Sequence, residues 1–378
     1  MAGASVASEL SGQARVLLLE REQQPGYHST GRSAAAFIPS YGSDNPTLRL
    51  LSNHSLDFML NPPGELGCGE LLRRRGLLTL CTPDHAPQLE REYARQLGSF
   101  PSLLPADHDF IRAQVPLVTD EYARGGWFEP DVYDIDVNAL HEGYLRDLRR
   151  QGGQIVNEVE IQNISREKDM WRIDASDASY SAPVLVNAAG AWADEVAALA
   201  GIQTIGLAPL RRTAVLLDPP AGCDVSAWPL VIASDGSFYF KPDAGLILVS
   251  PADEHPSAPC DAQPEELDIA YAVHFAQQAL QLQVRQVKHS WAGLRNFTPD
   301  RTPVIGFAAD AEGFFWLAGQ GGHGIQTAPA AARLAAGLLL GSGIPNDLQQ
   351  AGFNHAWVSP QRFSRSGNTQ TNVQTTVS

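Results

Sequence analysis

The feature that most constrains this fold is a short apolar strand that ends on an acid near the start of the chain. The run Arg15–Leu19 leads into Glu20, and a helical pattern that begins around Gly3 precedes it. In a β-α-β unit that binds a dinucleotide, such a strand follows the helix of a G-x-G-x-x-G turn, and its terminal acid binds ribose hydroxyls. Gly3 stands where the third glycine would fall, and Glu20 lies roughly 20 residues past the first. The opening therefore predicts an α/β fold with a parallel sheet.

The same opening lacks the first strand and the first two glycines of such a unit. Without that central strand, apolar faces and backbone groups of its neighbours stay unpaired, and the turn that admits a pyrophosphate is missing. We therefore expect Met1 to be an internal methionine of a longer reading frame. Two alternatives stay open for the chain as given. Either it holds its cofactor despite the missing strand, or it is a truncated, cofactor-free protein without catalysis.

Composition and charge exclude several classes of function. The 378 residues can bury a large core and predict two domains, and the net charge of -15 argues against nucleic acid and against an anionic membrane surface. No window approaches roughly 18 consecutive apolar residues, so no transmembrane segment is expected. The four cysteines form no C-x-x-C pair, and the ten histidines show no metal-ligand spacing. We expect a cytoplasmic protein with reduced thiols and no metal site.

Two kinds of pattern follow along the rest of the chain: helices next to buried strands, and then a series of short β-type runs. Asp136 is a candidate cap for a helix that ends near Gly152, and residues 155–161 are typical of a strand. A buried strand at 184–186 then runs into Asn187–Trp192, which repeats the strand–glycine–helix order of the opening. Short β-type runs follow between about 211 and 295, at 213–217, 237–241 and 246–250, before a helical pattern at about 264–283. This second pattern predicts an antiparallel sheet inserted into the nucleotide-binding part.

The carboxy-terminal third contains a glycine-rich loop ahead of a long helix. The segment Gly319–Gly324 has four glycines in six residues, and an alanine- and leucine-rich helix is predicted from Gln326 to Leu340. Glycines let a ligand approach the backbone, and a helix amino terminus offers N–H groups and a positive dipole end. A flavin ring suits such a place because its reduction puts negative charge on the pyrimidine side. We interpret His323 as a lining residue rather than a base.

Taken together, these motifs resemble the FAD-dependent amine and amino-acid oxidoreductases of the D-amino acid oxidase type. This group includes glycine oxidases and sarcosine oxidases, and the likeness is greatest to the D-arginine dehydrogenases. It rests on segments 19–22, 25–35, 187–192, 238–245, 291–295 and 320–327. The resemblance implies a discontinuous FAD-binding Rossmann-like domain (1–43, 135–208 and 297–358) that lacks its first strand. It also implies an inserted antiparallel-sheet substrate domain (44–134 and 209–296). The tail, with almost no apolar residues after Ser359, is expected to be disordered (359–378).

The resemblance implies a role in FAD binding for residues in every part of the predicted nucleotide-binding domain. Glu20 would bind the adenosine ribose, Arg21 would lie beside the adenine, and Val159 would offer backbone bonds to it. The pyrophosphate and flavin would be lined by Ser29, Thr30, Arg32, Ser33 and Ala34. The remaining contacts of the cofactor would come from Gly3, Gly190, Trp192, Gly322, Gly324, Ile325 and Gln326. The relatives that bind flavin covalently carry a cysteine where Gly293 falls here, so FAD should be bound non-covalently.

The resemblance also implies the substrate site and the reaction. Arg212 and Arg295 would bind the carboxylate of an amino acid, since a guanidinium stays charged and forms bidentate bonds. Tyr239 and Tyr41 would close the pocket, and the backbone carbonyls of Gly293 and Gly322 could accept the amine. A D-amino acid would lose hydride from Cα to flavin N5, and the imino acid would hydrolyse to a 2-oxo acid and ammonia. The sequence leaves the electron acceptor and the oligomeric state open.

Two positions depart from the arginine-preferring relatives. Leu77 stands where those relatives carry an acid for the substrate guanidinium, and Ala36 stands where they carry a histidine. Both changes make the pocket more apolar, so we expect a preference for neutral or hydrophobic D-amino acids. Other interpretations remain open: a secondary amine or 2-hydroxy acid as substrate, a solvated strand end at Glu20, a structural salt bridge at Arg295, and a core aromatic at Tyr239.

Overall fold

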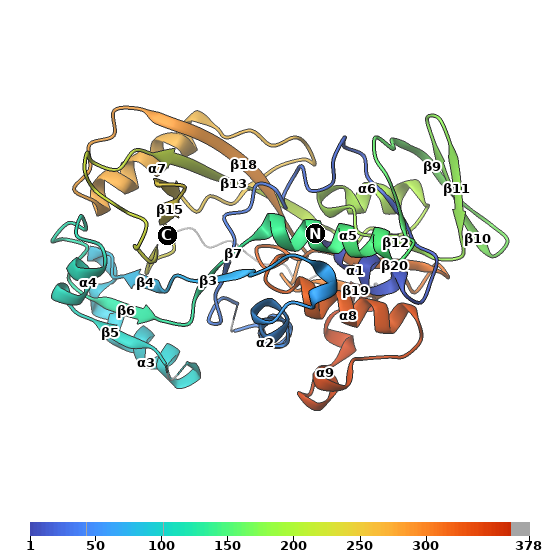
Figure 1. Ribbon diagram of the computed structural model, residues 1–378, viewed down its shortest axis with the longest axis horizontal. Helices are drawn as coiled ribbons and strands as arrows, with labels where there is room; N and C mark the ends of the chain where they lie inside the picture. The colour runs from blue at the N-terminus through green and yellow to red at the C-terminus, as the bar shows by residue number, and fades with distance from the viewer. Residues whose placement is uncertain (43, 101, 364–378) are drawn as a thin grey trace, which may run out of the picture.

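The computed structural model describes residues 1–42, 44–100 and 102–363, which fold into two regions along the long axis of the molecule (Figure 1). One region is built on a large mixed sheet. The other contains small sheets with parallel strand pairs, and helices cover them. The predicted α/β class is therefore confirmed. The functional site described below lies between the two regions, because its lining comes from both.

The large sheet is covered by helices on one of its faces. Its strands follow the order β17-β13-β16-β15-β14-β4-β6-β5, with β18 paired to β13, and only β14 and β4 run parallel. Helices α4 (His108–Gln114) and α7 (Glu266–Ala279) contribute to the apolar core on one face. The strands are β4 (Leu77–Leu80), β5 (Leu104–Ala106), β6 (Gly126–Glu129), β13 (Ala208–Leu217), β14 (Leu230–Ala233), β15 (Tyr239–Asp243), β16 (Leu246–Ser250), β17 (His255–Pro256) and β18 (Val287–Phe297).

The second region holds the predicted nucleotide-binding elements. Strand β1 (Leu17–Leu19) pairs in parallel with β8 (Gln154–Val156), and β12 (Leu185–Asn187) pairs in parallel with β20 (Phe314–Ala318), which in turn meets β19 (Val304–Phe307). Helix α1 (Ala2–Ser11) packs against α5 (Val137–Arg150) and α8 (Ala328–Leu339). Among the described residues no strand pairs with β1 on its side away from β8, nor with β12 on its side away from β20. The parallel strands thus form two separate pieces.

Local sequence signals account for several helix ends. The Asp136 carboxylate accepts a hydrogen bond from the Ala139 N–H at 2.8 Å, so the predicted cap of α5 is confirmed. Asn45 caps α2 (Pro46–Leu60) in the same way, and Pro46 occupies the first helical turn, where it loses no hydrogen bond. The other helices are α3 (Leu89–Ser99), α6 (Ala193–Leu199) and α9 (Asn346–Gln350).

Two smaller sheets complete the fold. One joins β2 (Ala36–Phe37), β7 (Tyr133–Ile135) and β3 (Leu72–Arg74). The other is the projecting antiparallel ribbon of β9 (Ile161–Glu167), β10 (Met170–Ala175) and β11 (Ser179–Ala182), seen at the right of Figure 1. Strands β10 and β11 pair as an antiparallel hairpin.

Two sequence predictions were wrong. The expected strand at 155–161 is interrupted, because Glu158 has a left-handed backbone (φ 59) and the N–H groups of Glu158 and Val159 donate to the carbonyls of Glu22 and Glu20. The second concerns the tail, which was expected to be disordered from residue 359. Its first residues are ordered instead, since Pro360–Phe363 forms a 3-10 turn and Ser359 is buried. Residues 364–378 lie outside the described part of the chain.

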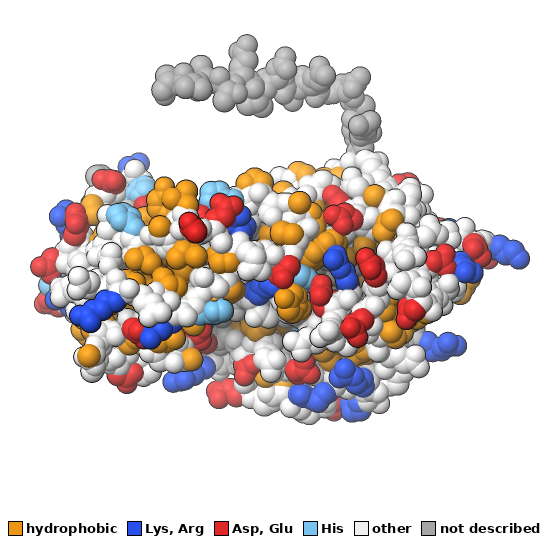
Figure 2. Space-filling view, turned by 90° about the horizontal axis from the view of Figure 1, so that it is seen from above, with side chains coloured by type: hydrophobic (Ala, Val, Ile, Leu, Met, Phe, Trp, Pro, Cys, Tyr) orange, Lys and Arg blue, Asp and Glu red, His pale blue; other side chains and the backbone are white. Residues whose placement is uncertain are grey.

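The surface carries mixed charges and scattered apolar groups. Figure 2 shows hydrophobic side chains gathered over the half of the molecule that holds α7, where Leu267 is 59% exposed and Tyr271 is 47% exposed. Acidic and basic side chains are interspersed over the rest of this face. Within the residues that the structure describes, no helix is both long and apolar enough to cross a lipid bilayer.

Candidate active site

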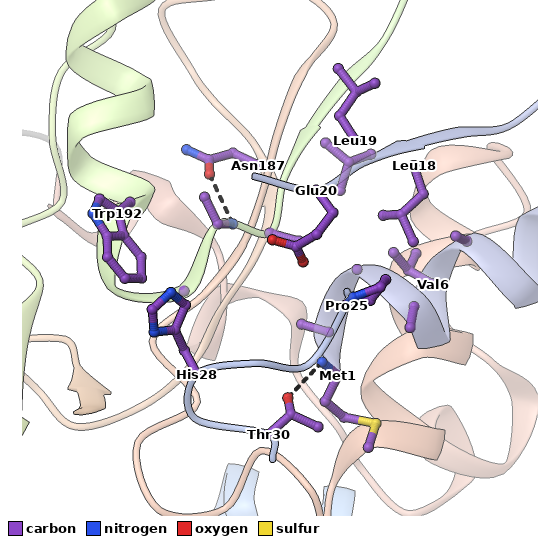
Figure 3. Close-up of a pocket in the computed structure, with 18 of the residues that line it drawn as sticks. Met1, Val6, Leu18, Leu19, Glu20, Pro25, His28, Thr30, Asn187 and Trp192 are labelled. Atoms are coloured by element: carbon purple, nitrogen blue, oxygen red, sulfur yellow. Dashed lines mark hydrogen bonds between the residues drawn. The ribbon is translucent and has the colours of Figure 1, made fainter. Parts of the chain in front are cut away.

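One large cavity runs between the two regions. Its volume is about 1070 Å³, and it is lined by α1, β1, the loop after β1, the turn after β12, the loop before α8, and one edge of the large sheet. Ligand pockets for compact small molecules span roughly 300–1,000 Å³, so this cavity has room for a larger ligand such as a dinucleotide. Figure 3 shows its nucleotide end, with Glu20 pointing into the space between Trp192 and the start of α1.

Glu20 directly follows strand β1 and lines the cavity. Its backbone N–H continues the β1–β8 ladder by donating to the Val156 carbonyl, and its carboxylate accepts the Glu22 N–H at 3.0 Å. The Cζ atom of Arg21 lies 5.3 Å from the centroid of the Trp192 ring, so two flat side-chain groups border this end of the cavity. The Val159 N–H donates to the Glu20 carbonyl, which leaves only the Val159 carbonyl for a bond to an adenine.

The loop from 25 to 34 forms the middle of the cavity wall. Gly26 has a left-handed backbone (φ 89), and its carbonyl accepts the Gly31 N–H, which closes the loop on itself. Thr30 accepts a hydrogen bond from the Met1 amino group at 2.9 Å (Figure 3). Ser29 donates to the Leu294 carbonyl at 2.6 Å. The Arg32 guanidinium binds Asp261 and the carbonyls of Ala262 and Ala292, so this side chain ties the loop to the large sheet region.

The glycine-rich loop before α8 approaches the cavity closely. A Cβ built on Gly322 would lie 2.6 Å from the Tyr41 hydroxyl, which is closer than side-chain atoms pack, and in tight contact at 3.2 Å with the Arg295 Cζ. Gly322 therefore allows these two groups to converge beside the backbone. The predicted residues Gly3, Ser33, Ala34, Gly190, Gly324 and Ile325 also line the cavity. Gln326 does not, because its buried amide binds both backbone groups of Ile38 and the Ser52 hydroxyl.

One face of the large sheet presents the predicted substrate residues to the cavity. Directly paired residues project from the same face. The register pairs Arg212 with Gly293 and places Arg295 two residues further along β18, so all three share a face. Tyr239 lies on the same face of β15, and all four line the cavity. Arg211 projects from the opposite face, where it binds Glu265 and Asp268.

The two arginines of this face differ in their partners. Arg212 donates to the Asp253 carbonyl at 2.7 Å and to the Glu254 carboxylate at 3.2 Å, and Glu254 also binds Arg301. Arg295 makes no ion pair with any described residue. Burial would lower the pKa of Arg295, but the nearby Tyr41 and Tyr239, followed by Glu254 and Asp253, raise it overall. Burial and the neighbouring Arg295 lower the pKa of Arg212. The site therefore holds an unneutralised cation that suits an anionic ligand.

Tyr41 and His323 form a stacked pair at the edge of this site. Their ring centroids lie 4.1 Å apart with an interplanar angle of 19°. His323 is 8% exposed, and burial together with Arg295 and Arg301 lowers its pKa to about 4, so its ring is neutral at physiological pH. Its Nε2 has no hydrogen-bond partner among the described residues. His323 is not among the residues that line the cavity, so the predicted lining role is not confirmed.

Three further predicted residues lie behind the cavity wall. Tyr41, Leu77 and Ala36 do not line the cavity, and all three belong to an apolar cluster with Ile38, Val132, Leu230, Ile232 and Tyr239. This cluster lies next to the substrate face rather than at the flavin side. The sequence reasoning missed Glu254, which binds Arg212, and Glu129, which binds Ser40. Neither acid belongs to a recognisable motif, so only the sheet register could have found them.

The cavity also extends between the two separate parallel pieces. Leu17–Leu19 of β1 and Leu185–Asn187 of β12 both line it, as does α1 beneath them. These strands are less buried than interior parallel strands usually are, and Leu17 is 40% exposed. The nucleotide end of the cavity is thus continuous with an apolar slot between β1 and β12.

Comparison with known proteins identifies the family. The family model described as "FAD dependent oxidoreductase" matches residues 1–338. The chain belongs to this family. It is an oxidoreductase, and FAD is the cofactor of the family.

Individual relatives are distant but cover most of the chain. FAD-dependent oxidoreductase domain-containing protein 1 of Xenopus laevis is 24% identical, with 92% of this chain and 77% of the relative covered. Glycine oxidase of Pseudomonas aeruginosa is 26% identical, with 86% and 88% covered. The crystal structure of glycine oxidase from Geobacillus kaustophilus superposes with a TM-score of 0.82, 22% identity and 96% of each chain covered. This last likeness shows the fold.

The cavity fits a non-covalently bound FAD by the chemistry of its lining. A strand-terminal carboxylate, a helix amino terminus and a closed hydroxyl-bearing loop follow one another along one wall. These groups match a ribose, a pyrophosphate and the linker between them. The glycine loop at the other end leaves space for a flat ring beside Arg295 and Tyr239. Within the described residues, no cluster of histidine, cysteine, aspartate or glutamate could hold a metal ion.

Proposed function

We propose that this FAD-dependent oxidoreductase oxidises a D-amino acid to the imino acid, which hydrolyses to a 2-oxo acid and ammonia. The observation that carries the proposal is Arg295, a cation without a counter-ion among the described residues that lines the cavity beside Tyr239. A substrate carboxylate supplies the missing charge and can accept two guanidinium bonds. Arg212 adds a second cation, held in place by Asp253 and Glu254.

In this proposal bound FAD would supply the hydride acceptor, and the residues of the chain orient the substrate. Arg295 and Arg212 fix the carboxylate, so the position of Cα relative to the glycine loop is set by two charge-assisted contacts. Tyr239 lines the cavity beside the two arginines and would shield the bound carboxylate from water, while the Tyr41 hydroxyl would support Arg295 from behind the cavity wall. Gly293 and Gly322 line the cavity, and their carbonyls would accept N–H bonds from the neutral amine. No strong base is required at Cα, because the nitrogen releases the proton to water.

We propose that the side-chain pocket favours neutral and hydrophobic D-amino acids over D-arginine. Leu77 sits among Ile38, Leu230 and Ile232, so an apolar side chain that reaches this cluster is stabilised by burial. Glu129 is the acid on this face nearest to Leu77 in the register, and Ser40 already binds its carboxylate. The proposal keeps the predicted division into an FAD-binding domain and an inserted substrate domain.

The test is a substrate screen on protein reconstituted with FAD. D-leucine, D-phenylalanine, D-arginine, N-methylglycine and D-lactate are compared by kcat/KM with an artificial electron acceptor and with oxygen. We expect D-leucine or D-phenylalanine to exceed D-arginine by at least about tenfold, in line with one buried side chain's transfer energy. Dominant turnover of D-arginine would refute the side-chain assignment. Dominant turnover of the secondary amine or the hydroxy acid would refute the substrate class.

A further inference from the structure

The turn that carries Tyr41 is fixed from both sides of the active site. It connects β2 to α2, and the Gln326 amide binds Ile38 at its start, with its Oε1 accepting from the Ile38 N–H at 2.9 Å and its Nε2 donating to the Ile38 carbonyl at 3.1 Å. His323 stacks on the Tyr41 ring from the same side. These two contacts tie the turn to the loop before α8, beside the predicted flavin position.

On its other side, the turn that carries Tyr41 is hydrogen-bonded to a buried acid of the large sheet. Glu129 ends β6 and is 2% exposed. Its Oε1 accepts the Ser40 N–H at 3.2 Å, and its Oε2 accepts the Ser40 hydroxyl at 2.5 Å. Ser40 immediately precedes Tyr41. Burial raises the pKa of the Glu129 carboxyl, while the two bonds from Ser40 oppose that rise.

The register places Glu129 on the substrate face. Glu129 pairs directly with Leu77, Leu77 pairs with Leu230, and Ile232, two residues along from Leu230, pairs with Tyr239. Side chains of paired residues lie on the same face, so a continuous row runs from Tyr239 to Glu129. Glu129 therefore lies at the far end of the face that carries Arg212 and Arg295, and it contacts the turn that brings the Tyr41 hydroxyl toward Arg295.

We propose that Glu129 is a positioning residue for substrate-carboxylate binding, acting through Ser40 to hold the Tyr41 hydroxyl beside Arg295. The proposal rests on the proposed function, in which Arg295 binds the substrate carboxylate. A buried carboxylate with two bonds to one residue has a defined orientation, and it transmits that orientation to the next residue in the chain. Glu129 itself touches neither the cavity nor the substrate.

The test measures coupling between Glu129 and Tyr41. Benzoate, a carboxylate that cannot be oxidised at Cα, is titrated by calorimetry into FAD-loaded wild type, Glu129→Gln, Tyr41→Phe and the double variant. We expect Glu129→Gln to weaken benzoate binding on the order of tenfold in the wild-type background, as for loss of a hydrogen bond to a charged group. In the Tyr41→Phe background the same change should alter binding less than about twofold, because the hydroxyl that Glu129 positions is gone.

Asp147→Asn is the matched control. Asp147 is also buried and accepts a serine hydroxyl, that of Ser8, at 2.6 Å, but it lies on α5, away from the substrate face. This variant should lower thermal stability without changing benzoate affinity at saturating FAD. If Glu129→Gln does not fold, Ser40→Ala cuts the same link from the other side and should show the same loss and the same dependence on Tyr41.

The outcomes separate the two proposals. If Arg295→Met retains benzoate affinity, the proposed carboxylate site is wrong. If Arg295→Met loses affinity while Glu129→Gln does not, or if Glu129→Gln weakens binding equally with and without the Tyr41 hydroxyl, the positioning role is wrong and Glu129 only stabilises the fold.

Discussion

Replacement of Arg295 by methionine should weaken ligand binding without destabilising the protein. In the free protein this guanidinium lines the cavity and has no ion pair among the described residues. Burial opposes its charge, and only neighbours without a direct ion pair, Tyr41 and Tyr239 first, offset that cost. A methionine of similar length fills the space without that penalty. We expect the unliganded variant to be at least as stable as the wild type in thermal unfolding.

The magnitude of the binding loss follows from the contact that disappears. Truncating one partner of a buried, hydrogen-bonded charge pair costs about 2–5 kcal/mol, which corresponds to roughly 30- to 5,000-fold in affinity. Calorimetric titration of benzoate into FAD-loaded protein gives this number directly. The Kd for FAD should change little, because the cofactor binds to the other parts of the cavity.

Arg211→Met is the matched control on the neighbouring position of β13. Arg211 binds Glu265 at 2.5 Å and the buried Asp268 at 3.1 Å on the opposite face of the sheet. Its removal should cost about 3–5 kcal/mol of stability and leave benzoate affinity unchanged, since it leaves the buried Asp268 with only His255 as a partner. The reasoning is refuted if Arg295→Met binds benzoate within threefold of the wild type, or if it loses as much stability as Arg211→Met.

Three more outcomes are expected. Gly322→Ala places a Cβ 2.6 Å from the Tyr41 hydroxyl, so benzoate affinity should drop at least about tenfold with little change in melting temperature. Glu20→Gln should weaken FAD binding about 10- to 100-fold in a fluorescence titration, because a charged hydrogen-bond acceptor is lost. The pKa of His323 is lowered to about 4, so the unfolded state takes up more protons below pH 6.5. His323 should therefore contribute about 2 kcal/mol to the loss of stability from pH 7 to 5, and His323→Phe should remove that share of the loss in denaturant titrations at both pH values.

Much of the fold could be predicted because its signals are local. The cap at Asp136 and strand β16 depend on short-range hydrogen bonds and on apolar runs that the neighbouring residues already display. The strand at 155–161 failed because its break depends on backbone bonds from Glu158 and Val159 to a loop more than 130 residues earlier. A pattern within seven residues carries no information about that distant partner.

At the site, too, some features follow from the sequence alone and others from the tertiary structure. The sequence by itself determined the chemical groups: an acid after the first strand, a hydroxyl-bearing loop, a glycine loop before a helix, and arginines in two β-type segments. It also determined that adjacent Arg211 and Arg212 must project from opposite faces of any strand. Which of the two faces the cavity was decided only by the pairing of β13 with β18 and by the acids on α7 that bind Arg211.

Only the tertiary structure could leave Arg295 without a counter-ion and surround it with Tyr41, Tyr239 and Gly322. These groups lie far apart in the sequence, and their distances depend on sheet register and on the turn held by Glu129. Electrostatic free energy depends on distance and burial rather than on residue type alone. The sequence therefore determined which charges the protein carries, and the packing of the two regions decided which charge remains free to bind a substrate.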